Sequence, residues 1–430
     1  MDKDSLRTQT LALYHLRVFW QGIKSILAKP VRVLIVPFAL LAAILFRLLW
    51  IAASPEIIRP IVSDITIPII IISAAFSVYV LGAQKRSLDI YKDMLRAGIV
   101  NSAGEAPLLI ARSKANDVET LTFLVTGIPL DVWRDNQAAI ETALNLTIGT
   151  IRESSDKRTI TIEAVSPSVA FADTIPFTTE MLPDRDTVFA LGETITRQPV
   201  TIDFNSIPHA LIGGATGSGK STQLRLLIHQ AVLHGADVYL VDLKGLDFID
   251  IQQIQLVTEI ENALSTIQTV ENEMYARLND FRAHGAKDYR DYCLKADPRK
   301  YKRIFLIIDE ISMLLDHGTS KEAKARSTEA ADSLAAIARQ GRAVAVYLIL
   351  STQRPDAASL PGSIKSNINC RICGSADATL STIVLGDGRA NDLPKDQPGI
   401  FLYSDGKEDS IYKGYILSNT IERSENLDKR

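Results

Sequence analysis

The sequence predicts an α/β protein whose main domain is a parallel β-sheet covered by helices on both faces. From about residue 201, short apolar runs alternate with segments of helical periodicity. A glycine-rich turn, residues 214–221, joins one apolar run to an amphipathic run, and a second apolar run ends in Asp309 and Glu310. This alternation is typical of βαβ units, and the polar residues at the strand ends indicate a site at one edge of the sheet.

Length and composition leave room for more than this domain. The 430 residues are 47% hydrophobic and 23% charged, which is enough for two globular cores and an additional segment. The formal net charge of −3 gives no overall basic signal, so binding to a polyanion would have to come from a local patch. Three cysteines fit a reducing compartment, and the Cys370/Cys373 pair has no second pair with which to form a zinc site.

The additional segment lies at the N-terminus and predicts a transmembrane hairpin. Residues 31–53 and 61–83 are each apolar and long enough to cross a hydrocarbon core of about 30 Å. Lysine and arginine precede the first run and follow the second, so both ends of the chain are expected in the cytoplasm. The alternative of a cleaved signal peptide does not account for the second apolar run. Residues 1–86 therefore predict a two-pass anchor in the cell membrane.

Three further segments follow this anchor. Residues 87–200 predict a linker helix and a small α+β module, because a strand, a helix and two more strands can be read from their periodicity. Residues 201–420 contain the α/β domain, and residues 421–430 form a polar tail.

The glycine-rich turn has the pattern of a phosphate-binding loop. In GATGSGKS the glycines let successive backbone N–H groups turn toward phosphates, and the following helix adds the positive end of its dipole. Lys220 is expected to reach the β- and γ-phosphates, and the Ser221 hydroxyl to ligate Mg²⁺. The predicted nucleotide-binding residues are Gly214, Ala215, Thr216, Gly217, Ser218, Gly219, Lys220, Ser221 and Thr222.

The second motif, RIFLIIDE, predicts the catalytic carboxylates. Asp309 at the strand end is expected to hold Mg²⁺ through water, while Glu310 orients or deprotonates the attacking water. A third strand, VAVYLILSTQRP, places Gln353 at the equivalent edge, where it can sense the γ-phosphate. Consecutive Asp and Glu at a strand end favour ATP hydrolysis over phosphoryl transfer to a small molecule.

Taken in order, the motifs of residues 205–400 resemble those of the FtsK/SpoIIIE family of DNA-pumping ATPases. The matching segments are PHALIGGATGSGKS, VDLKG, ENEMYARL, LIIDE, RQGRAVA, LSTQRP and SIKSNINCRI. The resemblance implies a RecA-like P-loop ATPase domain, with ATP and Mg²⁺ as cofactors, that assembles as a homohexamer around double-stranded DNA. A family box usually written Arg-Ala-Ala-Gly is Arg342-Ala343-Val344-Ala345 in this chain.

Arg342 is the candidate for a catalytic arginine. The nucleotide-binding motifs contain no obvious arginine to neutralise the charge that develops on the γ-phosphate. A neighbouring subunit of a ring can supply one, which is worth about 10³–10⁵ in rate in well-studied nucleotide hydrolases. Arg342 and Arg339 lie between a helical segment and the strand of Gln353, and Arg371 on the following strand is the alternative.

The layout of the chain is similar to the coupling proteins of Gram-positive conjugative plasmids and integrative elements. The septal chromosome pumps of the family have more membrane helices, a long linker and a C-terminal winged-helix module, none of which is expected here. This resemblance implies DNA, a relaxase and mating-channel proteins as partners. A chromosome or plasmid segregation pump is the main alternative. A type VII-like protein-export ATPase is a weaker one, because those motors carry several nucleotide sites in tandem.

Overall fold

A computed structural model of the chain describes residues 87–125, 127–315, 320–353, 360–406 and 409–418, with isolated positions before residue 76. The predicted membrane helices, residues 31–53 and 61–83, lie mostly outside the described residues, as does the tail, residues 421–430. Among the described positions, no helix combines the length and apolar character that crossing a membrane requires.

The chain divides into two compact units, Met1–Pro167 and Ser168–Arg430. The sequence placed the start of the α/β domain later, at residue 201. The difference arises because β6 (Val188–Thr194) and β7 (Pro199–Asp203) form a hairpin that pairs with β15 (Asp409–Gly414). These strands therefore belong to the sheet of the second unit rather than to the small module.

The first unit contains a four-stranded antiparallel sheet in the order β1-β2-β4-β3, within its described residues. The sequence predicted three of these strands and missed β1, and it predicted one helix where α5 and α6 are separated at Asn136. Trp133 and Phe123 are fully buried in its core, with ring centroids 5.3 Å apart. Its elements are α4 (Ser87–Arg96), β1 (Leu108–Ala115), β2 (Val118–Leu124), α5 (Leu130–Asp135), α6 (Gln137–Leu144), β3 (Thr147–Glu153) and β4 (Thr159–Val165).

The second unit is built on a sheet whose described strands run in the order β10-β9-β11-β12-β8-β13-β14-β15-β6-β7. The strands from β10 to β13 are parallel, and the remaining ones pair antiparallel. The parallel strands are β8 (His209–Gly213), β9 (Asp237–Val241), β10 (Gln255–Val257), β11 (Ile304–Ile308), β12 (Val346–Thr352) and β13 (Cys370–Gly374), and β14 (Ile400–Ser404) follows. The prediction of parallel strands is confirmed for the six strands from β10 to β13, whereas β14, β15, β6 and β7 extend the sheet with antiparallel pairing.

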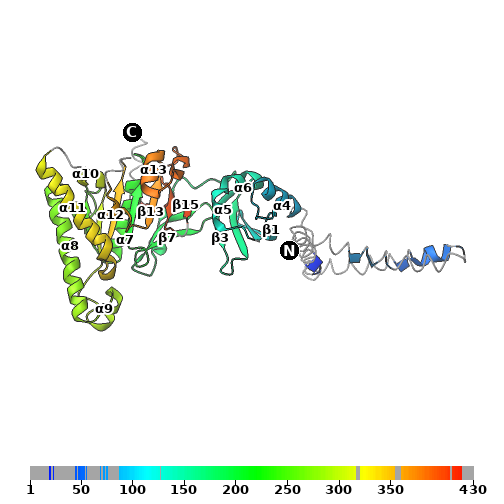
Figure 1. Ribbon diagram of the computed structural model, residues 1–430, viewed down its shortest axis with the longest axis horizontal. Coiled ribbons are helices and arrows are strands. Elements are labelled where there is room, and N and C mark those ends of the chain that lie inside the picture. Colours follow the sequence, from blue (N-terminus) through cyan, green and yellow to red (C-terminus); the bar gives the residue numbers. More distant parts are fainter. Residues whose placement is uncertain are drawn as a thin grey trace. The chain divides into compact units, whose positions relative to one another are not determined.

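Helices cover both faces of this sheet, as the alternation of strands and helices predicted. The longest are α8 (Ile260–Ala283) and α11 (Lys321–Gln340), which lie side by side in Figure 1. The other helices are α7 (Lys220–Leu233), α9 (Tyr289–Lys295), α10 (Ile311–Leu315), α12 (Gly362–Lys365) and α13 (Ala378–Leu385). Short 3₁₀ turns are η1 (Thr179–Met181), η2 (Gly341–Val344) and η4 (Arg389–Asp392), and β5 (Pro176–Phe177) pairs with β16 (Ile416–Leu417).

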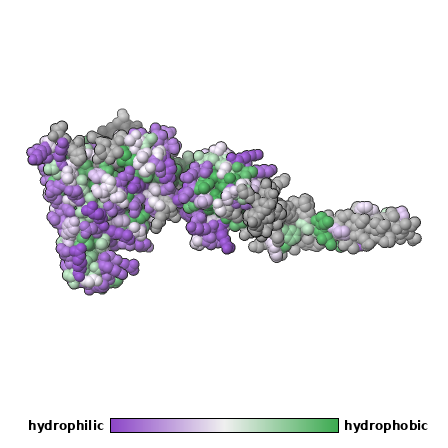
Figure 2. Space-filling view, in the orientation of Figure 1, coloured by the Kyte–Doolittle hydropathy of each residue, from purple (hydrophilic) through white to green (hydrophobic). Residues whose placement is uncertain are grey.

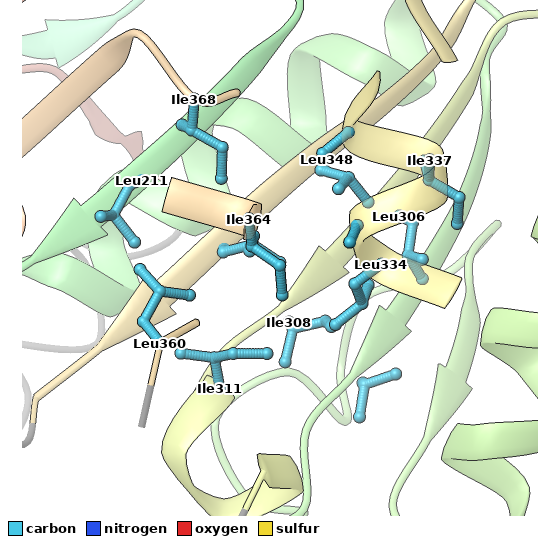
Figure 3. Close-up of a cluster of buried hydrophobic side chains, with 14 of the residues drawn as sticks. Leu211, Leu306, Ile308, Ile311, Leu334, Ile337, Leu348, Leu360, Ile364 and Ile368 are labelled. Carbon is cyan, nitrogen blue, oxygen red and sulfur yellow. The ribbon is translucent and has the colours of Figure 1, made fainter. Parts of the chain in front are cut away.

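Alternate residues of the central strands enter two separate cores. Leu306 and Ile308 of β11 pack with α10, α11 and α12 on one face, as Figure 3 shows. Phe305 and Ile307 of the same strand enter the core on the other face, which includes apolar side chains of α7. Every residue of β11 is buried, which explains why this strand reads as a continuous apolar run rather than an alternating one. The apolar side chains are enclosed in these cores, and the face of this unit that Figure 2 shows is mostly hydrophilic.

His209 on β8 has a structural role. Its ring is fully buried, and its Nδ1 accepts the backbone N–H of Leu348 on β12 at 2.9 Å. Burial lowers the pKa of His209 to about 4, so the ring is neutral at physiological pH. The histidine that precedes the phosphate-binding loop thus links the amino end of β8 to β12.

Candidate nucleotide-binding site

The glycine-rich loop connects β8 to α7 at the carboxyl edge of the parallel strands. Gly217 and Gly219 have φ angles of +85° and +99°, which residues with a side chain rarely adopt. A Cβ on Gly219 would also lie 2.9 Å from the backbone nitrogen of Gly399. That Gly399 N–H donates to the Ser218 carbonyl at 2.8 Å, so the loop is braced by the turn before β14. All nine predicted nucleotide-binding residues lie in this loop and the first turn of α7.

Lys220 begins α7 and is 3% exposed. Its Nζ donates to Asp309 Oδ1 at 2.6 Å, to the Asp309 carbonyl at 3.0 Å and to Ser351 Oγ at 2.7 Å. The Ser351 hydroxyl also donates to the Asp309 carbonyl. Three acceptors therefore satisfy the buried ammonium, and they come from the ends of β11 and β12. The structure thus places the lysine of one sequence motif directly against the aspartate of the other.

Glu310 has a carboxylate that is 6% exposed and fixed by three donors. Oε1 accepts from Ser312 Oγ at 2.5 Å and from Thr352 Oγ1 at 3.0 Å, and Oε2 accepts the backbone N–H of Gln353 at 2.9 Å. A carboxylate held in this way keeps one orientation without substrate, as a group that positions an attacking water requires.

Gln353 joins the carboxylate to the phosphate-binding loop. Its backbone contacts Glu310, and its side-chain Oε1 accepts from Thr216 Oγ1 at 3.2 Å. Thr216 lies within the loop that is expected to surround the phosphates. Gln353 is thus placed to couple the presence or absence of the γ-phosphate to the position of the Glu310 carboxylate.

The oxygen atoms at this site fit a magnesium ion bound together with nucleotide. Asp309 Oδ2 is buried and makes no hydrogen bond among the described residues, so it has lone pairs available for a metal-bound water. The Ser221 hydroxyl donates to Asp247 Oδ2 at 3.1 Å. The described residues contain no group of three or more His, Cys, Asp or Glu side chains able to hold a metal. Magnesium in ATPases usually takes part of its coordination from phosphate oxygens, so an ion at this site would bind together with the nucleotide.

Sequence reasoning missed Ser351, Thr352 and Asp247. The first two directly precede Gln353, and hydroxyl side chains at the end of an apolar strand were a signal that could have identified them. Asp247 comes from the loop after β9, and its contact with Ser221 arises only when the two loops meet at the sheet edge.

Arg342 lies at the edge formed by the amino ends of the parallel strands, whereas the phosphate-binding loop lies at the edge formed by their carboxyl ends. It is part of η2, just before the start of β12, and its Nε donates to the Asn205 carbonyl at 3.0 Å. It lines an open groove of about 1280 Å³ together with Arg290, Arg303 and Arg339. The structure therefore does not bring Arg342 into the nucleotide site of its own subunit. The alternative, Arg371, donates to the backbone carbonyls of residues 365 and 384.

The site combines a phosphate-binding loop between β8 and α7 with Asp309 and Glu310 at the end of β11, which is separated from β8 by β12 in the sheet. This arrangement defines a P-loop ATPase. Residues 181–357 match the FtsK/SpoIIIE family. The chain therefore contains an FtsK/SpoIIIE family ATPase domain, and the resemblance drawn from its motifs is confirmed.

Several known proteins are similar to the chain. DNA translocase SpoIIIE of Bacillus subtilis (strain 168) is 28% identical over 256 residues, which are 55% of this chain and 32% of SpoIIIE. DNA translocase SftA of the same strain is 30% identical over 249 residues, 54% of this chain and 25% of SftA. The chain thus spans about a third or less of the length of these relatives.

A solved structure covers more of the chain. The pCW3 conjugation coupling protein TcpA, in a monomer form with ATPγS, superimposes with a TM-score of 0.58 and 29% sequence identity. The match covers 80% of this chain and 100% of that one. This is more than the second unit, which begins at Ser168, can supply by itself. The similarity therefore extends into the first unit.

Proposed function

We propose that the protein is a membrane-anchored, ATP-driven DNA translocase that acts as a coupling protein in conjugative transfer. The observation that carries this proposal is the match to TcpA across all of that chain and both units of this one. The sequence alignments with the translocases SpoIIIE, SftA and FtsK cover only 48–62% of this chain. A segregation pump of the FtsK/SpoIIIE type is the alternative, since it would use the same motor.

ATP hydrolysis follows from the arrangement of the site. Lys220 and the backbone N–H groups of the loop would hold the β- and γ-phosphates of bound ATP, and Ser221 and Asp309 would supply oxygens to its magnesium ion. Magnesium, when bound with the nucleotide, neutralises charge on the phosphate oxygens. Glu310, already oriented by three hydrogen bonds, positions the attacking water and accepts its proton. Gln353 links this carboxylate to the phosphate-binding loop.

The anchor and the ring belong to the same proposal. The apolar runs at residues 31–53 and 61–83 support a two-pass anchor in the cell membrane with both termini in the cytoplasm. A homohexameric ring is part of the proposal because the resemblance to the FtsK/SpoIIIE family implies it. DNA, a relaxase and mating-channel proteins are the proposed partners.

Two readouts test this function in wild-type protein and in a Glu310→Gln variant. Purified full-length protein is expected to displace a triplex-forming oligonucleotide from duplex DNA when ATP is present, and the variant is not. In cells that carry the mobile element encoding this chain, deletion of the gene is expected to abolish DNA transfer to recipients. Complementation with the wild-type gene restores transfer, whereas complementation with the Glu310→Gln gene does not.

The outcomes separate the two candidate functions. If the deletion strain transfers DNA at the wild-type frequency but fails to partition a chromosome or plasmid, the proposed function in conjugation is wrong and segregation takes its place. ATP hydrolysis unaffected by any DNA, without triplex displacement, would contradict DNA translocation in both forms.

Arg342 is proposed to complete the nucleotide site of the neighbouring subunit. Its position at the opposite sheet edge allows this role only between subunits. Lys220→Ala subunits retain Arg342, and Arg342→Ala subunits retain an intact phosphate-binding loop. Rings assembled from both inactive variants are therefore expected to regain hydrolysis at their mixed interfaces, measured as ATP turnover against mixing ratio.

Arg185→Ala is the matched control for this mixing experiment. Arg185 lines the same groove and forms an exposed ion pair with Asp203 at 3.1 Å, so its loss is expected to leave turnover within about twofold of wild type. Absence of recovery at every ratio, with both variants folded and shown to co-assemble, would remove Arg342 from the active site.

A further inference from the structure

The loop that follows β9 is held firmly next to the phosphate-binding loop. Asp242, which is fully buried, accepts the backbone N–H groups of Lys244 and Asp247 at 3.1 and 3.3 Å. Phe248 is fully buried in the core beneath α7. These contacts fix the backbone on both sides of the Asp247 side chain.

Arg225 of α7 anchors the same loop from the helix side. Its guanidinium pairs with Asp250 at 2.8 Å and also donates to the Asp247 carbonyl. It lies over the Phe248 ring, 5.4 Å from the centroid. A loop held from two directions leaves the Asp247 carboxylate little freedom, which is the condition for a group that positions a ligand.

The Asp247 carboxylate points at the residue expected to bind magnesium. Its Oδ2 accepts from Ser221 Oγ at 3.1 Å. Adjacent ligands of an octahedral magnesium ion, each at 2.0–2.1 Å from it, are about 2.9 Å apart. The two oxygens are thus already spaced approximately as neighbouring positions around one such ion. Asp309 Oδ2, which is buried and makes no hydrogen bond within the described part of the chain, is a further oxygen at the end of β11.

We propose that Asp247 is a third residue of the magnesium site, acting with Ser221 and Asp309 to hold the ion directly or through one bound water. The inference rests on the proposed ATPase function and adds to it a residue outside the two sequence motifs. Mg²⁺ prefers oxygen ligands and keeps several waters, and a carboxylate that accepts from such a water fixes its position.

A purely structural role makes a different prediction. As an acidic residue beside the N-terminal turn of α7, Asp247 would stabilise the helix dipole and the Ser221 hydroxyl whether or not magnesium is present. The magnesium dependence of nucleotide binding separates the two roles, because only a metal-site residue changes it.

The test is calorimetric titration of full-length protein with ATPγS, in excess magnesium and in EDTA, for wild type, Asp247→Asn and Asp250→Asn. Asp247→Asn is expected to weaken binding about tenfold in magnesium and to leave binding in EDTA unchanged. Asp250→Asn removes the ion pair with Arg225 but keeps the Asp247 carboxylate. For Asp250→Asn, the ratio of the ATPγS dissociation constant in magnesium to that in EDTA is therefore expected to keep the wild-type value.

Equal weakening by Asp247→Asn in both buffers, or no weakening in either, would overturn the proposal and leave Asp247 a structural residue. A changed ratio in Asp250→Asn would likewise overturn it, because loop position rather than the carboxylate would then control the metal. Wild-type protein that binds no ATPγS in magnesium would instead contradict the proposed ATPase function. The two failures are thus distinguishable in one experiment.

Discussion

Lys220→Ala is expected to reduce ATP turnover by at least about a hundredfold, because it removes a positive charge from the β- and γ-phosphates. It also has a second effect that the motif alone does not reveal. The Lys220 ammonium is the buried partner of Asp309, whose side chain is 1% exposed. Removing one member of a buried ion pair leaves an uncompensated charge, which costs about 3–5 kcal/mol. Turnover and melting temperature should therefore fall together.

The double variant Lys220→Ala/Asp309→Asn separates these effects. It removes the unpaired charge, so its melting temperature is expected to recover toward the wild-type value while turnover remains lost. Lys302→Ala serves as the matched lysine control, because the Lys302 ammonium forms an exposed ion pair with Asp237 at 3.3 Å. Turnover within a few-fold of wild type in the Lys220→Ala protein would refute the assignment of the phosphate-binding lysine.

Glu310→Gln is expected to lower turnover by at least about a hundredfold while ATP binding is retained. The replacement has nearly the same size, and one amide oxygen can still accept from Ser312 and Thr352. The amide nitrogen would then face the backbone N–H of Gln353, so that two donors meet where the wild-type protein has a donor and an acceptor. The lost hydrogen bond costs about 1 kcal/mol. Binding and stability should therefore change little compared with the loss of the catalytic carboxylate.

Titration with ATPγS and measurement of ATP turnover under single-turnover conditions check this expectation. Glu261→Gln is the control, because Glu261 is exposed on α8 and pairs with Arg326 on the surface at 2.7 Å. Loss of nucleotide affinity in parallel with turnover would show that Glu310 acts in binding rather than in catalysis. Normal turnover would exclude it from the reaction.

Much of the candidate site could be predicted because its residues are local in sequence. The loop from Gly214 to Ser221 takes its form from its own glycines and from the strand and helix that flank it. The Asp309–Glu310 pair follows a strand that is buried throughout, so its apolar run was recognisable. Gln353 was recognisable for the same reason, because it ends the apolar run of β12.

The secondary structure around each motif, the parallel central strands and the resemblance to the FtsK/SpoIIIE family could be predicted from the sequence. Contacts between distant segments are seen only in the folded chain: the β6–β7 hairpin joins the ATPase sheet through β15, and Asp247 accepts a hydrogen bond from Ser221. The tertiary structure also places Arg342 at the sheet edge away from the phosphate-binding loop of its own subunit. Periodicity records which face of an element is buried, but strand pairing and loop contacts depend on hydrogen bonds and packing between residues far apart in the chain.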